Sequence, residues 1–158
     1  MSGRDPPLRV AVLTGAAMVP EPGLEDLLAG LLDFAYRREA GRPASLDLLL
    51  AGDSEMAGLN RRHLGVDSPT DVIAFEDGEE DGEGRLRLGD IAVGLETARR
   101  TAAQRGGDPG LEAAFYALHG LLHLLGRRDG GAAERAAMLG EQARLMREYG
   151  IEAAAELL

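Results

Sequence analysis

Two of the three histidines of this 158-residue chain, His119 and His123, lie four residues apart in the segment FYALHGLLHLLGRRD. On a helix this spacing places both imidazoles on one face, one turn apart, where they can bind the same metal ion. Gly126 favours a left-handed end to that helix, and a chain that turns back there can bring the carboxylate of Asp129 to the same point. Three ligands and an open position are typical of a catalytic zinc site. The same spacing also occurs on helices where each histidine is an ordinary polar group beside the core.

Metallopeptidases share this histidine spacing and provide a first functional alternative. Those enzymes need a Glu directly after the first histidine to activate the metal-bound water. Here that position is Gly120, and no other carboxylate lies on the helix near the histidines. The sequence therefore disfavours a peptidase.

Charge and composition exclude several other classes of protein. The chain has 17 Lys and Arg against 27 Asp and Glu, a formal net charge of −10, and it has no Cys. It therefore has neither disulfides nor a thiolate metal site, and its acidic balance disfavours a general nucleic-acid coat protein. An enzyme with a local basic cleft stays compatible with this charge. No apolar run is long enough for a membrane span, and the start of the chain lacks a signal-like apolar segment, so we expect a cytoplasmic protein.

The elements that must position the histidines alternate along the chain. Period-two alternation and β-branched runs predict strands, and apolar residues at helical spacing between Gly, Pro and Asp signals predict helices. The expected strands are 8–12, 46–50, 70–76 and 85–94. The expected helices are 23–39, a short one from Asp53, 95–105, 109–126 and 132–149.

These elements predict one α/β (α+β) domain over residues 1–158. Helices are expected to cover a mixed four-stranded sheet, with the two-histidine helix in a central place facing the cleft. The acidic segment 76–84 is expected to be a solvated loop that joins two neighbouring strands. The residues expected on the inner side of the last helix are Met138, Leu139, Leu145, Met146 and Tyr149.

Four blocks of the sequence occur together in a specific order: LN at 59–60, SPTDVIAF at 68–75, LGDI at 88–91 and HGLLHLLGRRD at 119–129. In order and spacing they resemble the YbeY family of bacterial rRNA-maturation endoribonucleases, over about residues 45–146. The resemblance implies a single-domain α/β protein with one zinc ion. The activity it implies is a single-strand-specific, metal-dependent endoribonuclease in small-subunit rRNA maturation and ribosome quality control. The implied partners are rRNA and the small ribosomal subunit, with no membrane and no DNA.

The chain departs from the family pattern HGxLHLxGYDH at its third metal ligand, where Asp129 stands in place of His. Asp is a legitimate oxygen ligand for zinc, but it moves the preference of the site toward other divalent ions. His63 and Leu64 take the places of a family Tyr and Arg, and such an arginine is expected to bind a phosphate in the cleft. These two changes leave a second reading open, a ribosome-associated metal-binding factor with little catalytic activity.

Arginines near the motifs are the candidates for substrate binding. We hypothesise that Arg62, Arg127 or Arg128 reaches the phosphate that the missing arginine would have bound. Arg61, Arg85 and Arg87 also lie near the motifs, and exposed, solvated arginines are the ordinary alternative for the whole set. Asp71 is either a supporting residue near the cleft or a turn-forming carboxylate. In the catalytic reading, a metal held by His119, His123 and Asp129 lowers the pKa of a bound water and polarises a phosphoryl oxygen.

Overall fold

A computed structural model describes residues 6–39 and 41–151 of the chain. Its elements follow in the order β1 (Leu8–Thr14), α1 (Leu24–Arg37), β2 (Ala44–Ala51), α2 (Asp53–Leu64), β3 (Val72–Glu76), β4 (Leu86–Gly94), α3 (Leu95–Arg105), α4 (Pro109–Leu124) and α5 (Ala132–Tyr149). The four strands form one sheet in the order β1-β2-β4-β3. β1, β2 and β4 run parallel, and β3 is antiparallel to β4. The predicted α+β fold with a mixed four-stranded sheet is confirmed.

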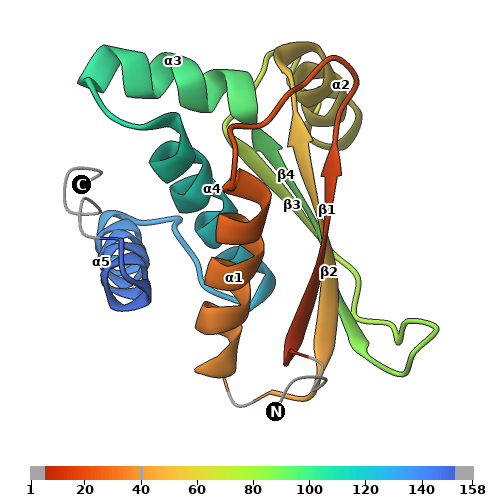
Figure 1. The fold of residues 1–158 in the computed structure, drawn as a ribbon. Coiled ribbons are helices and arrows are strands. Elements are labelled where there is room, and N and C mark those ends of the chain that lie inside the picture. The colour runs from red at the N-terminus through yellow and green to blue at the C-terminus, as the bar shows by residue number, and fades with distance from the viewer. Residues whose placement is uncertain (1–5, 40, 152–158) are drawn as a thin grey trace.

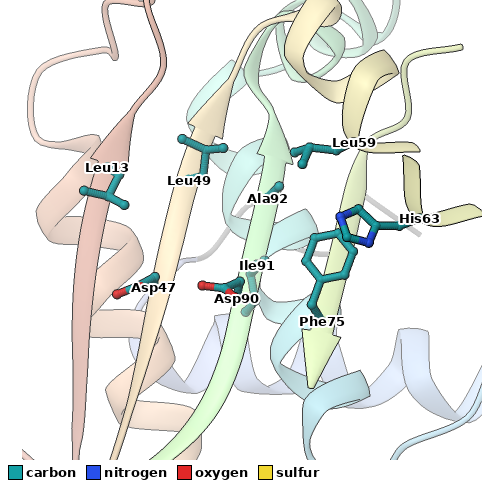
Figure 2. A pocket seen from close by; sticks show the side chains of 9 residues that line it. All are labelled: Leu13, Asp47, Leu49, Leu59, His63, Phe75, Asp90, Ile91 and Ala92. Carbon is teal, nitrogen blue, oxygen red and sulfur yellow. The ribbon is translucent and has the colours of Figure 1, made fainter. Parts of the chain in front are cut away.

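Helices α1 and α4 pack on one face of the sheet, and α5 packs outside α4 (Figure 1). The interface between them is the hydrophobic core, in which alternate residues of β2 meet the apolar stripes of the two helices. Fully buried leucines at this interface are Leu28, Leu31, Leu32, Leu46, Leu48, Leu50, Leu118 and Leu121. On the other face, α2 packs through Met56 against Ala51, Ile73 and Ala92, and the remaining sheet surface forms a shallow pocket (Figure 2).

A bulge in β4 depends on a glycine of the LGDI block. The register between β2 and β4 shifts at Ser45/Leu46, and Gly89 lies opposite this shift with a φ of 149°. A Cβ atom on Gly89 would lie 1.9 Å from the carbonyl oxygen of Phe75. Because only glycine combines this backbone conformation with this close approach, the bulge and the pairing of β3 with β4 both require it.

Two sequence-based expectations about single residues are wrong. Leu139 was expected on the inner side of the last helix, but it is 38% exposed, whereas its neighbour Met138 is buried. Arg85, one of the cations near the motifs, is buried, and its guanidinium donates to the carbonyl oxygens of Pro6 and Ala44. The acidic loop does join neighbouring strands, as predicted, since it connects β3 to β4. No helix in the described part of the chain has the length and apolar character needed to cross a membrane.

Candidate metal centre

Helix α4 has a defined start and end, and both fix the position of the histidines. Asp108 caps the first turn by accepting a hydrogen bond from the backbone N–H of Gly110 at 2.8 Å, and Pro109 occupies the first helical position. At the other end Gly126 has a φ of 93°, and the N–H groups of Gly126 and Arg127 donate to the carbonyl oxygens of His123 and Leu122. This pattern is a Schellman motif, which reverses the chain toward Asp129.

The reversal brings the three predicted ligands together. The Nε2 atoms of His119 and His123 lie 2.9 Å apart, and Oδ2 of Asp129 lies 3.4 Å from the first and 3.3 Å from the second. Ligand atoms about 2.0–2.1 Å from a tetrahedral zinc ion are about 3.3 Å apart, so this donor set fits such an ion. All three side chains are half-buried, with exposed fractions of 25%, 33% and 39%. The group can hold a divalent metal ion, and three ligands leave one of the four positions of a tetrahedral ion for another ligand.

Gln142 orients the first of these histidines, and the sequence analysis did not identify it. Its side chain is fully buried on α5, and its amide N–H₂ donates to the carbonyl oxygen of Phe115 at 3.1 Å. Its Oε1 therefore faces Nδ1 of His119 at 3.2 Å and accepts the proton from that nitrogen. With the proton on Nδ1, the lone pair of Nε2 is directed toward His123 and Asp129. The only sequence signal for this role was a polar residue one turn after Met138 on the buried face of α5.

Position 120, where metallopeptidases have their glutamate, has no room for a side chain. It lies on the side of α4 that touches the sheet, where a Cβ atom would be 2.8 Å from Cγ2 of Ile91. A longer side chain would push the helix away from β4. The structure therefore agrees with the sequence argument against a peptidase.

A groove of about 570 Å³ runs beside the metal centre along the edge strand β3. We call it the metal groove. His63 and Leu64, in the last turn of α2, line one side of it, and His123 and Arg128 line the other. A smaller cavity of about 90 Å³ reaches the centre from the opposite side, where it is lined by His119, Asp129 and Gln142 among others. The candidate centre therefore borders the metal groove through His123 and the smaller cavity through His119 and Asp129.

Of the residues predicted to bind substrate, the structure brings two arginines to the metal groove. Arg128 is exposed there and has no ion pair within the described residues. Arg127 also lines the groove, but its guanidinium pairs with Glu39 at 2.5 Å and with Glu141 at 3.0 Å. The hydrogen bonds that Arg127 donates to the carboxylates of Glu141 and Glu39 raise the pKa of Arg127 and tie α5 to the segment after α1. These two ion pairs within the protein therefore neutralise the charge of Arg127.

The other two predicted substrate residues lie elsewhere. Arg62 does not line the metal groove, and its Nη1 would lie 3.6 Å from a Cβ atom on Gly58, so its side chain lies back along α2. Asp71 accepts a hydrogen bond from the backbone N–H of Val72 at 2.7 Å and lines a separate depression with Thr70 and Tyr116. This local contact with the first residue of β3 favours the capping or turn-forming alternative considered for Asp71.

Comparison with known proteins agrees with this geometry. A profile described as endoribonuclease YbeY matches residues 13–150. A relative of that name from Pelotomaculum thermopropionicum is 39% identical over 137 residues, which cover 84% of this chain and 90% of the relative. Another from Synechocystis is 38% identical over 151 residues, which cover 85% of this chain and 84% of the relative.

A solved structure shares the fold. The solution structure of a protein from Thermotoga maritima superposes with a TM-score of 0.63 at 24% sequence identity and covers 90% of this chain and 88% of that one. The profile match spans most of the chain and includes both histidines, Asp129 and the metal groove. The chain therefore belongs to the endoribonuclease YbeY family, which confirms the resemblance seen in the sequence and the class of enzyme it implied, an RNA-cleaving hydrolase with a role in rRNA processing.

Proposed function

We propose that this protein is a zinc-dependent endoribonuclease that cleaves single-stranded rRNA during maturation of the small ribosomal subunit in the cytoplasm. The observation that carries the proposal is the convergence of His119, His123 and Asp129 beside an open groove. We further propose that residues 1–158 act as one domain. Family membership supports the RNA substrate, and the donor set of two nitrogens and one oxygen supports zinc.

Each of these side chains has a distinct role in the proposed phosphodiester cleavage. His119, His123 and Asp129 would hold the zinc ion, which would supply Lewis-acid chemistry for a phosphoryl oxygen and lower the pKa of a water. Gln142 keeps the proton of His119 on Nδ1, so that Nε2 stays available as a ligand. Arg128, which forms no ion pair with any of the residues that the structure describes, supplies a guanidinium on the metal groove, where it can bind a phosphate of the strand.

Arg128 is the cation that best replaces the arginine expected at position 64. Leu64 is 65% exposed on the opposite side of the same groove, so the apolar residue supplies no guanidinium there. Arg127 is held by two carboxylates and Arg62 lies along α2. We therefore narrow the proposed phosphate contact to Arg128.

The test is cleavage of a small-subunit rRNA fragment that contains both single-stranded and duplex segments. The zinc-loaded protein is expected to cut within the single-stranded segments, and His119→Ala is expected to abolish cutting while the protein stays folded by circular dichroism. Cleavage by His119→Ala at the wild-type rate would overturn the proposal. No cleavage by the zinc-loaded wild type would favour the alternative hypothesis, a ribosome-associated metal-binding factor with little or no catalytic activity.

A further inference from the structure

His63 is an aromatic group of the metal groove that the proposed chemistry does not use. Its ring is exposed and packs on the ring of Phe75, with centroids 4.3 Å apart and planes tilted by 47°. Figure 2 shows the two rings together at the edge of the sheet, His63 from α2 and Phe75 from β3. The pair therefore forms a small aromatic surface built from two different elements.

This surface is held in place by buried contacts. Phe75 packs against the buried cluster that contains Met56, Ile73 and Ala92 beneath α2. Asn60, one turn before His63, is 5% exposed and donates from Nδ2 to the carbonyl oxygen of Ser68 at 3.0 Å. That bond holds the segment between α2 and β3 against α2. The aromatic surface is thus largely preorganised.

The position of His63 connects it to the metal centre. Its ring lines the metal groove together with His123, one of the ligands, and with Arg128. It also lines the pocket on the open face of the sheet, so it forms the ridge between the two hollows. A strand that places one phosphate between the metal centre and Arg128 runs along the groove toward this ridge.

We propose that His63, supported by Phe75, is the platform on which an unpaired base of the RNA strand stacks while the strand lies in the metal groove. The proposal rests on the proposed nuclease function and specifies how a single strand is recognised. Proteins that bind single strands combine a cationic groove with aromatic side chains that stack on the bases, irrespective of sequence. Bases in a duplex are stacked on one another and paired, so they cannot occupy this platform.

The absence of tryptophan from the chain provides a direct test. His63→Trp introduces the only tryptophan, and a base stacked on it is expected to quench its fluorescence. Arg61→Trp is the matched control, because Arg61 lies on the same helix, is 59% exposed and does not line the groove. Titration uses a single-stranded oligoribonucleotide of about 12 nucleotides and the corresponding duplex. Quenching is expected for His63→Trp with the single strand alone, and little change is expected for Arg61→Trp.

Affinity measured by fluorescence anisotropy of the labelled oligoribonucleotide gives the second readout. His63→Ala is expected to weaken binding of the single strand about tenfold, and His63→Phe is expected to restore it, because stacking needs the ring and not its nitrogens. Equal affinities for wild type and His63→Ala, or equal quenching in both tryptophan variants, would overturn the platform. If equal affinities or equal quenching are found while the wild type still cleaves RNA, only the platform proposal fails. If the wild type neither binds nor cleaves the single strand, both proposals fail.

Discussion

Replacing Gln142 by Leu should weaken metal binding more than it weakens the fold. The substitution removes two buried hydrogen bonds, the one from His119 Nδ1 at 3.2 Å and the one to the Phe115 carbonyl oxygen at 3.1 Å. Two neutral buried bonds at about 0.5–1.5 kcal/mol each set the loss of folding stability at about 1–3 kcal/mol, partly offset by the apolar Leu side chain. Removal of the hydrogen-bond partner of a metal-binding histidine typically weakens metal affinity by about 10–100-fold, or about 1.4–2.7 kcal/mol.

The conservative variant Gln142→Glu separates the two roles of this side chain. A carboxylate can still accept the proton of His119 Nδ1, but it cannot donate to the carbonyl oxygen of Phe115. Gln142→Glu should therefore keep wild-type zinc affinity while it loses stability. Met146→Ala is the matched control, since Met146 is fully buried on the same helix and its truncation costs about 2–5 kcal/mol through a cavity.

Two measurements test this. Competition with a fluorescent chelator gives the zinc affinity, and urea unfolding of the metal-free protein gives the folding stability. The expected result is a Kd raised at least tenfold in Gln142→Leu and unchanged in Gln142→Glu and Met146→Ala, with all three variants less stable. Equal zinc affinity in Gln142→Leu and wild type would refute the argument that Gln142 fixes the tautomer of His119.

Three further predictions follow from other contacts. Gly120→Glu should lower stability by about 1–3 kcal/mol in urea unfolding and create no peptidase activity, because its side chain meets Ile91; a stable variant would contradict this packing. Arg128→Ala should raise the KM for RNA and reduce the slope of log affinity against log salt by about 1, whereas Arg127→Ala should mainly lower stability; equal salt slopes in Arg128→Ala and wild type would refute the phosphate contact. Hydrogen bonds from the Arg85 N–H, the Ser45 hydroxyl and the Glu83 N–H lower the pKa of Asp81 below 3.8. Its stabilising effect is present above 3.8 and is lost as pH falls through the lowered value, so Asp81→Asn should flatten the acid limb of a stability-against-pH curve, and an unchanged limb would refute this.

Local signals in the sequence were sufficient for the bounds of two helices. The bounds 95–105 and 132–149 agree with α3 and α5, because Gly106 and Gly150 end these helices in left-handed conformations. The reversal at Gly126 is equally local, which is why Asp129 could be predicted to approach the histidines. Capping and turn residues therefore predicted most of the metal centre.

Features that depend on contacts between distant segments could not be predicted in the same way. In the order β1-β2-β4-β3, only the pairing of β3 with β4 was expected, because the pairings of β1 with β2 and of β2 with β4 join strands far apart in the chain. Gln142 joins α5 to α4, and its importance is visible only once the two helices are packed. Leu139 was placed on the wrong side because α5 has apolar residues on more than one face. Nothing in the local sequence predicts that folding buries Arg85 against backbone carbonyls.

The central claim is that Asp129 completes a metal centre with His119 and His123, and the zinc content of purified protein tests it most directly. After dialysis against zinc-free buffer, we expect about one zinc ion per chain in the wild type and in the control Asp67→Asn, whose carboxylate is 73% exposed on α2's flanking loop. Asp129→Asn should retain much less zinc, and Asp129→His should restore it, because imidazole is also a zinc ligand. One zinc ion per chain in Asp129→Asn, held as tightly as in the wild type, would contradict the proposed metal centre.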